Sequence, residues 1–234
     1  MIALRCEDSV AEIVPERGAL CSRLLLCGEE ILYLDAATLE DAQKNVRGGI
    51  PVLFPIAGKP DPGSPLKQHG FARNAAWEPT RTGPSSLECR LREGIWDLLL
   101  AFTLQQRALR LDFTAHASEP ATFQLGFHPY FAVADKAAAR VATAATQAFD
   151  NRTGKTGGYA PPDFTQGEID LQLLDHREAG TVLDRPAPLQ LSWSPGFTRL
   201  VLWTLPDKPF ICVEPWTSRG ALRAPATLSF EISR

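Results

Sequence analysis

The sequence lacks the long apolar runs and long charged runs that are typical of membrane proteins and nucleic-acid-binding proteins. No apolar run approaches the ~20 residues that a membrane-spanning helix needs, and the charged N-terminal segment does not resemble a signal peptide. The formal net charge is −3 without clustering of one sign, so we expect no nucleic-acid partner and no membrane partner. These absences predict a soluble, cytoplasmic protein, and we expect a monomer or a weak homodimer.

Cysteine and histidine are both scarce, and neither occurs at the spacing of a metal site. The five cysteines show no C-x-x-C spacing and mostly lie among apolar neighbours, which predicts reduced, packed thiols in place of disulfides or a zinc site. The four histidines form no H-x-H or H-E-x-x-H motif. We therefore predict no metal ion and no cysteine nucleophile.

Helical periodicity is rare, and alternation of apolar and polar residues with a period of two dominates the chain. The breaks between these runs are short and suit antiparallel hairpins, since a parallel crossover needs about a dozen residues or more. We predict a single domain over residues 1–234, all-β and built as a large antiparallel β-sandwich. The expected strands are residues 11–15, 19–26, 31–34, 87–91, 96–104, 109–115, 121–127, 189–193, 200–205, 211–214 and 228–232.

Residues 135–149 are a segment in which a helix competes with strand and loop. Alanine is frequent there and Asp135 can cap a first turn, which favours a helix. Thr143, Thr146 and the absence of a clean apolar stripe favour strand or loop. The following residues, 151–166, are rich in glycine, proline and threonine and form a loop long enough to cover a site.

A stretch rich in proline and glycine, residues 47–73, concentrates the features of a binding loop. It holds five prolines and five glycines around a short apolar run, so most of its backbone must form turns or extended loop. Its charged side chains give a local balance of 4 − 1 = +3 in a chain of net charge −3, which indicates an anionic or polyhydroxyl ligand. These charged residues are Arg47, Lys59, Lys67, Arg73 and the single acid Asp61.

Two apolar strands later in the chain end alike, with a titratable residue followed by proline, in FQLGFHPYF and FICVEPW. A residue before proline favours extended backbone, and proline cannot continue a central strand, so His128 and Glu214 should each stand at a strand end. In the first strand the alternation places Phe123, Leu125 and Phe127 on one face. His128 is therefore expected on the opposite face.

The surroundings of these two residues favour a binding site. A histidine near a strand end is usually a surface or hydrogen-bonded residue, and Glu-Pro is commonly a plain turn. Here aromatic residues accompany both, Tyr130 and Phe131 in one motif and Trp216 in the other, and aromatic faces are common platforms for sugar rings. A histidine and a glutamate placed in this way can act as acid and base.

Four motifs stand in order along the chain. They are RGGIPVLFP at residues 47–55, HGFAR followed by Trp77 at residues 69–77, GFHPYF at residues 126–131 and VEPW at residues 213–216. In these motifs the sequence resembles the aldose 1-epimerases (mutarotases), and particularly the branch of the hexose-6-phosphate mutarotases. The resemblance implies many antiparallel strands in two layers, often called a supersandwich, with a sugar in an open cleft on one sheet.

The resemblance implies that His128 is a general acid and Glu214 a general base. Mutarotation needs a proton given to the ring oxygen and a proton taken from the anomeric hydroxyl, after which the ring opens, turns about the C1–C2 bond and closes on the other face. One acid and one base suffice, each contributing ~10²–10⁴ in rate, so no organic cofactor is expected. The reference pKa values of about 4.3 for glutamate and about 6.5 for histidine predict a bell-shaped pH dependence.

The other site residues are expected to bind the sugar. Arginine side chains match phosphate well, which favours a hexose 6-phosphate, although the same basic residues can be solvated or bind sugar hydroxyls. For the aspartate that the family uses on sugar hydroxyls, the resemblance gives Asp170 in GEIDLQLL, with Asp163 as the alternative. The expected substrate-binding residues are Arg47, Gln68, His69, Arg73, Asp170 and Trp216.

Two other classes of function remain open. A non-catalytic carbohydrate-binding protein would use the same cleft and aromatic residues, and only a measured acceleration of anomer exchange separates it from a mutarotase. A metal-dependent sugar isomerase would use His69, His116, His128 and Glu214 as ligands, and loss of activity in a strong chelator would identify it.

Overall fold

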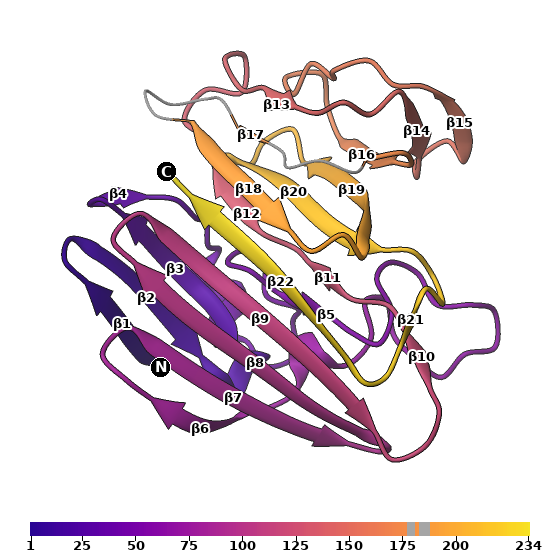
Figure 1. The fold of residues 1–234 in the computed structure, drawn as a ribbon. Coiled ribbons are helices and arrows are strands. Elements are labelled where there is room, and N and C mark those ends of the chain that lie inside the picture. Colours follow the sequence, from indigo (N-terminus) through magenta and orange to yellow (C-terminus); the bar gives the residue numbers. More distant parts are fainter. Residues whose placement is uncertain (177–180, 183–187) are drawn as a thin grey trace.

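The computed structural model describes residues 1–176, 181–182 and 188–234, and these form almost entirely antiparallel β-structure. Two large sheets face each other, and a smaller sheet of N-terminal residues packs beside them (Figure 1). The predicted all-β sandwich is confirmed. No helix within the described ranges is long and apolar enough to cross a membrane.

The first large sheet, named here the regular sheet, contains the longest strands of the chain (Figure 1). Its strands in spatial order are β13 (Val141–Ala142), β17 (Thr181–Val182), β18 (Leu189–Trp193), β22 (Ala226–Ser233), β9 (Ala108–Ala117), β8 (Trp96–Gln105), β7 (Ser86–Glu93) and β6 (Glu78–Thr82). In β9 the apolar residues Leu109, Leu111, Phe113 and Ala115 are fully buried, while the residues between them are exposed or half-buried. This is the alternation that the sequence predicts.

The second large sheet, named here the interrupted sheet, is built from shorter strands. In spatial order they are β15 (Lys155–Gly158), β14 (Gln147–Asp150), β16 (Ile169–Leu173), β19 (Phe197–Thr204), β20 (Phe210–Thr217), β11 (Gly126–Phe127) and β5 (Val52–Leu53), with β12 (Tyr130–Ala132) also paired to β20. β11 and β12 follow one another along the same side of β20, with Pro129 between them. Because proline cannot donate a ladder hydrogen bond, the pairing is interrupted there.

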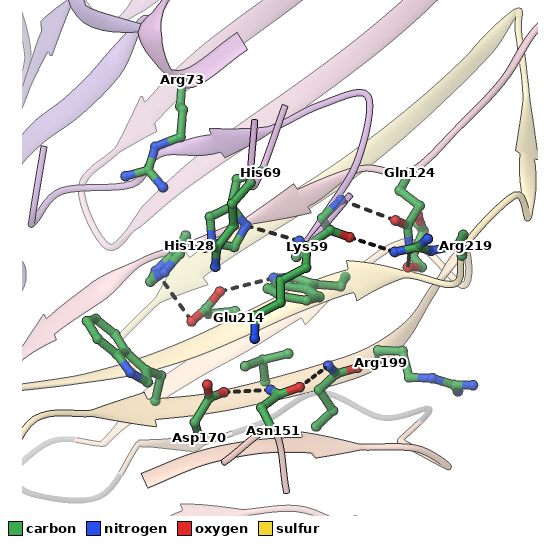
Figure 2. Close-up of a pocket in the computed structure, with 18 of the residues that line it drawn as sticks. Lys59, His69, Arg73, Gln124, His128, Asn151, Asp170, Arg199, Glu214 and Arg219 are labelled. Atoms are coloured by element: carbon green, nitrogen blue, oxygen red, sulfur yellow. Dashed lines mark hydrogen bonds and ion pairs between the residues drawn. The ribbon is translucent and has the colours of Figure 1, made fainter. Parts of the chain in front are cut away.

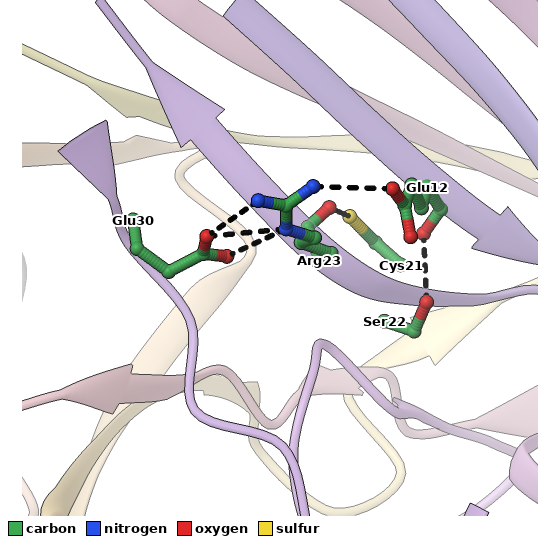
Figure 3. A network of polar contacts seen from close by, with 5 residues as sticks. All are labelled: Glu12, Cys21, Ser22, Arg23 and Glu30. Carbon is green, nitrogen blue, oxygen red and sulfur yellow. Dashed lines mark hydrogen bonds and ion pairs between the residues drawn. The ribbon is translucent and has the colours of Figure 1, made fainter. Parts of the chain in front are cut away.

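The smaller N-terminal sheet packs against the regular sheet. It contains β1 (Ile2–Cys6), β2 (Ser9–Val14), β3 (Leu20–Leu26) and β4 (Glu29–Glu30). On its exposed face, Arg23 of β3 binds Glu30 of β4 at 3.1 Å and Glu12 of β2 at 3.3 Å (Figure 3). Exposed ion pairs contribute little to stability, so the buried apolar face holds this sheet in place. The remaining elements are α1 (Ala36–Glu40), 3₁₀ turns at Pro15–Arg17 and Ala72–Asn74, and the pair β10 (Thr122–Phe123) and β21 (Leu222–Arg223).

Aromatic side chains fill the space between the two large sheets. Phe127 of β11 stacks on Phe230 of β22 with ring centroids 5.4 Å apart. Phe54 follows β5 directly, and the centroid of its ring lies 5.4 Å from that of Phe113 in β9 and 5.2 Å from that of Phe123. Phe123 and Phe127 therefore point into the core together with the fully buried Leu125, which confirms the predicted face, and Gln124 and Gly126 lie on the opposite face.

The structure decides one alternative that the sequence leaves open and contradicts one local expectation. Residues 135–149 form no helix, because the Asp135 carboxylate accepts the Ala137 N–H at 2.9 Å in a turn, and the residues beyond it pair as β13 and β14. Tertiary pairing thus overrides the helix propensity of alanine. Residues 31–34 form no continuous strand and contribute only isolated bridges, from Leu32 and Leu34.

Candidate active site

The register of the interrupted sheet sets His128 opposite Glu214. β11 pairs Gly126 with Trp216, and β12 pairs Tyr130 with residue 212 on the same strand β20. Continuing this register across the gap between β11 and β12 aligns positions 128 and 214. The two residues are far apart in the sequence, but the sheet makes them neighbours on adjacent segments of its backbone.

Only one of the two expected strand ends is present. His128 follows the last residue of β11, as predicted. Glu214 lies inside β20, which continues through Pro215 to Thr217, so its predicted terminal position is wrong. The reason is that no residues pair between Gly126↔Trp216 and Tyr130↔Cys212, and Pro215 lies within this span of β20, which is unpaired on that side and where a proline is tolerated.

His128 and Glu214 form a buried pair on the floor of a cleft. Nδ1 of His128 lies 3.4 Å from Oε1 of Glu214, and the side chains are 8% and 1% exposed. Burial lowers the pKa of His128 and raises the pKa of Glu214, and the negative charge of Asp170 raises the latter further. Because burial disfavours a net charge of either sign, the pair holds one proton over a wide range of pH.

Trp216 orients the second oxygen of Glu214. Its Nε1–H donates to Oε2 of Glu214 at 3.0 Å. The indole ring fits there because two neighbours are glycines. A Cβ at Gly126 would lie 2.7 Å from Trp216 Cδ1, and a Cβ at Gly58 would lie 3.2 Å from Trp216 Cζ3. The GFHPYF motif and the loop of residues 47–73 therefore each supply a glycine that allows close approach to the tryptophan.

His69 forms part of the cleft wall in a strained backbone conformation, with φ of 69°. The following Gly70 also has positive φ, and a Cβ there would lie 2.0 Å from the Phe54 carbonyl oxygen. Nδ1 of His69 accepts the Gly58 N–H at 3.0 Å, so the neutral ring carries its proton on Nε2. Nε2 lies 3.3 Å from Nε2 of Gln68, which is also a donor, so the two nitrogens do not hydrogen-bond to each other in this tautomer. Burial and the neighbouring arginine lower the pKa of His69 to about 3. His69 is thus a neutral hydrogen-bond donor.

Two arginines lie at one end of the cleft. Arg73 is 9% exposed and donates from Nη2 to the Val46 carbonyl oxygen at 3.1 Å. Its positive charge favours the ionised form of Glu214. Arg47, next to Val46, is exposed at the rim, and its guanidinium makes no hydrogen bond or ion pair with any described residue. The guanidinium of Arg47 is therefore free to bind a ligand. Arg73, in contrast, also holds the backbone next to Arg47 through its hydrogen bond to Val46.

Asp170 lines the cleft and Asp163 does not, which separates the two candidate aspartates. Oδ1 of Asp170 accepts a hydrogen bond from Asn151 Nδ2 at 2.6 Å. Asp163 is exposed and accepts from the Thr165 hydroxyl in its own loop at 2.6 Å. Asp163 is therefore the wrong choice for a cleft residue.

The expected catalytic and substrate-binding residues all line a single cleft of about 650 Å³. Cavities of roughly 300–1,000 Å³ are usual for small-molecule ligands. Figure 2 shows His69 and His128 on one side of Glu214, with Asp170 and Asn151 on the other. Lys59 also lines the cleft, but Lys67 of the same loop does not. The loop identified from composition therefore forms a wall of the site, and only part of its positive charge faces the ligand.

Several cleft residues escape the sequence reasoning. Gln124 could have been found, since it shares the outward face with His128 four residues later, and Gln172 follows Asp170 at strand spacing. No local signal marks the others, which enter the cleft only through the pairing of distant strands. The residues in question are Gln124, Asn151, Gln172, Arg199, Trp203 and Arg219.

A metal site built from the histidines is not assembled. His116 is exposed on β9 of the regular sheet and does not line the cleft. Within the described residues, one group of potential ligands has its atoms within 4.8 Å of one another, namely His128, Cys212 and Glu214. Burial raises the pKa of Cys212 well above its usual value, so its thiol remains protonated and is a poor ligand.

Comparison with known proteins agrees with this geometry. The sequence model described as aldose 1-epimerase matches residues 34–186, which is more than half of the chain. The chain belongs to the aldose 1-epimerase family. The sequence resemblance seen in the four motifs is thereby confirmed.

Individual known proteins are similar to most of the chain. A protein of Cenchrus ciliaris described as "Putative glucose-6-phosphate 1-epimerase" is 26% identical over 249 residues, covering 86% of this chain and 71% of that protein. The crystal structure of the Slr1438 protein from Synechocystis sp. PCC 6803 superimposes with a TM-score of 0.92 at 28% identity, over 99% of this chain and 94% of that one. YeaD from Salmonella typhimurium shares the fold, with a TM-score of 0.86 at 20% identity, over 99% of this chain and 88% of that one.

Proposed function

We propose that this aldose 1-epimerase family member interconverts the α and β anomers of a hexose, preferably a hexose 6-phosphate, with Glu214 as general base and His128 as general acid. The observation that carries the proposal is the buried contact of 3.4 Å between Nδ1 of His128 and Oε1 of Glu214 on the cleft floor. A pair that holds one proton always offers one acceptor and one donor. Mutarotation requires that combination.

The proton is returned at the end of each cycle. The reaction starts from the form of the pair in which His128 carries the single proton. The lowered pKa of His128 and the raised pKa of Glu214 favour the other form, with the proton on Glu214, so the reactive form is the minor one. Glu214 takes the proton of the anomeric hydroxyl while His128 gives a proton to the ring oxygen, and the C1–O5 bond breaks to give the aldehyde. Rotation about C1–C2 presents the other face of the carbonyl. On closing, the ring oxygen attacks C1 and loses its proton to His128, and Glu214 protonates the new anomeric oxygen. No electron acceptor is needed, and the pair ends in its starting state.

The pH dependence follows from the burial of the pair. At low pH a second proton binds and the base is lost, and at high pH the last proton leaves and the acid is lost. Because burial lowers the pKa of His128 and raises the pKa of Glu214, both limbs require a buried net charge. We expect a plateau of kcat/KM broader than the window between the reference values of about 4.3 and about 6.5. Anomer exchange measured from pH 4 to pH 10 tests this, and a narrow bell within that window would contradict it.

A phosphorylated sugar is the preferred substrate in this proposal. Arg47 is exposed and uncommitted within the described part of the chain, and the buried Arg73 lies next to it in the same cleft. Paired arginines suit a phosphate dianion. The name of the Cenchrus ciliaris relative points to the same substrate class.

Exchange spectroscopy by NMR tests the proposal directly. The rate of α to β interconversion is compared for glucose 6-phosphate, glucose and galactose with and without the protein. Acceleration of all three sugars at equal kcat/KM would remove the phosphate preference and leave the mutarotase. Binding of sugar without acceleration of any of them would favour a non-catalytic carbohydrate-binding protein.

A further inference from the structure

Three polar side chains form a hydrogen-bonded chain on the side of the cleft away from His128 (Figure 2). Asn151, at the end of β14, donates from Nδ2 to Asp170 Oδ1 at 2.6 Å. Gln172, two residues after Asp170 on β16, donates from Nε2 to Asn151 Oδ1 at 2.7 Å. The Asn151 N–H also donates to the Asp170 backbone oxygen at 2.9 Å. The amide of Asn151 is therefore fixed in one orientation between its two neighbours.

These bonds leave part of each side chain unused. A carboxylate has two acceptor oxygens, and a primary amide has one acceptor oxygen and two N–H donors. Among the described residues, no hydrogen bond reaches Asp170 Oδ2 or Gln172 Oε1, and one N–H of Asn151 is uncommitted. The cleft wall thus presents two acceptors with a donor between them. Because a hydroxyl has one hydrogen to donate, two acceptors require two hydroxyls.

An apolar residue separates this chain from the acid–base pair. The sheet register pairs Gln172 with Val201 of β19, and Val201 with Glu214 of β20. Gln172 and Glu214 are therefore two strand spacings apart, roughly 9–10 Å along the sheet. Val201 is nearly buried and lines the cleft floor between them. A pyranose whose anomeric hydroxyl meets Glu214 extends over Val201 and turns its more distant hydroxyls toward the amides.

The family resemblance implies that Asp170 contacts sugar hydroxyls; we propose that Asn151 and Gln172 join it in recognising two adjacent ring hydroxyls, and that Asn151 positions the Asp170 carboxylate for this contact. The proposal rests on the proposed function for the identity of the ligand as a sugar. It adds Asn151 and Gln172 to the binding residues. It also predicts that a sugar lacking either hydroxyl of the pair binds weakly.

Loss of the hydrogen bond between Asn151 and Asp170 should change the pH dependence of sugar binding. Burial raises the pKa of Asp170, and the Asn151 hydrogen bond lowers it. Removing that donor raises the pKa further, so the carboxylate, and the sugar binding that needs it, is lost at a higher pH as the pH falls. The charged groups that face Asp170 are Glu168, Asp150, Glu214 and Lys59.

The test is a titration-calorimetry panel with glucose 6-phosphate and its 2-, 3- and 4-deoxy analogues. The variants are Asn151→Leu and Gln172→Leu, which remove the polar groups; the first keeps the branched shape of the side chain and the second shortens it by one atom. Gln147→Leu is the matched control, because Gln147 is exposed on β14 and does not line the cleft. The anomers are free to equilibrate, so dissociation constants can be measured with active protein.

We expect the wild-type protein to bind two analogues, deoxygenated at adjacent carbons, on the order of tenfold more weakly than the parent sugar. Asn151→Leu should bind the parent sugar about tenfold more weakly, discriminate less than about threefold among the sugars, and lose binding at a higher pH than wild type. Gln172→Leu should lose discrimination at one of the two positions. Gln147→Leu should behave as wild type.

The proposal is overturned if wild type penalises none of the deoxy sugars or only one. It is also overturned if Asn151→Leu retains both the wild-type affinity and the wild-type acid limb of binding. These outcomes are distinct from failure of the proposed function. A wild-type protein that shows the deoxy-sugar pattern but no anomer exchange would disprove catalysis and leave the recognition of adjacent hydroxyls intact.

Discussion

The two large sheets are built from similar antiparallel strands, yet among the described residues only the interrupted sheet places buried titratable side chains in the cleft. In the regular sheet the outward residues of β9, such as Arg110, reach solvent. In the interrupted sheet the outward residues His128 and Glu214 are 6% and 1% exposed. The sheets differ because residues 47–73 and the chain after β14 fold over the second one.

The difference shows where this fold accepts an energetic cost. Burying an ionisable group costs several kcal/mol unless it is paired or loses its charge. In the interrupted sheet burial favours the uncharged forms of His128 and Glu214, which lie 3.4 Å apart, and Trp216 donates a hydrogen bond to Glu214. The described strands of the regular sheet carry no buried acidic, basic or histidine side chain, and their buried residues are the apolar ones that pack in the common core. Substitutions of the cleft residues of the interrupted sheet should therefore lower the rate of anomer exchange, and substitutions of the core residues of the regular sheet should lower the stability of the fold.

The largest effect is expected from Glu214→Gln. The amide keeps the shape of the side chain but cannot act as the base, so kcat/KM should fall by ~10²–10⁴. Glu231→Gln on β22 of the regular sheet is the matched control and should leave the rate unchanged. Exchange NMR on both variants measures the effect, and a Glu214→Gln protein within about threefold of wild type would remove Glu214 from the mechanism.

The next effect is on stability and comes from Phe113→Ala in the regular sheet. Phe113 is fully buried and contacts Phe54 and Trp77, so the cavity should lower the free energy of unfolding by about 3–5 kcal/mol. The rate per folded molecule at low temperature should be preserved. Thr114→Ala, on the outward face of the same strand, is the control. Urea denaturation measures the free energy of unfolding of both variants. A similar, small decrease in this free energy for the two would contradict the predicted packing.

An intermediate effect is expected from Gly126→Ala in the interrupted sheet. The new Cβ would lie 2.7 Å from Trp216 Cδ1, so the indole must move and its hydrogen bond to Glu214 weakens. Loss of one such bond should lower kcat/KM by about tenfold. Gly157→Ala in β15, where nothing lies within 4 Å of the added carbon, should have no effect on rate. Equal rates for the two alanine variants would show that Trp216 does not orient Glu214.

The smallest effect is expected from Arg90→Met on the outward face of the regular sheet. Arg90 binds the Asp97 carboxylate of the adjacent strand, with Nε donating to Oδ1 at 2.7 Å, and both side chains are about one-third exposed. Surface pairs contribute little, so the thermal midpoint should shift by less than about 4 °C, and less in high salt. Calorimetry at two salt concentrations measures this. A larger, salt-independent shift would mean that the regular sheet also depends on polar contacts.

The long strands of the regular sheet were predictable from the sequence, because one face is apolar and the other meets water. In such strands apolar and polar residues alternate, and β7, β8, β9 and β22 all lie where this alternation predicted a strand. Residues 135–149 were not decided by pattern, because β13 and β14 are short, β13 pairs with residues about 40 positions along the chain, and β14 lies between β15 and β16. Propensity is a weak guide where pairing is remote.

In the candidate site, local motifs predicted which residues matter but not how they meet. His128 and Glu214 were recognisable from the proline and aromatic residues beside them. The placement of Glu214 at a strand end was wrong, since only the register with β11 and β12 shows that a proline fits within β20. Asn151 carries no motif at all, and its contact with Asp170 exists because β14 pairs with β16.

The sequence by itself determined the all-β class, the faces of the long strands and the identity of the acid and base candidates, because periodicity and proline act through neighbouring residues. The tertiary structure decided the distances among them. Register set His128 against Glu214, chose Asp170 over Asp163 and placed Arg47 at the cleft rim. Burial then set their protonation, because the dielectric around a side chain depends on residues that are remote in sequence.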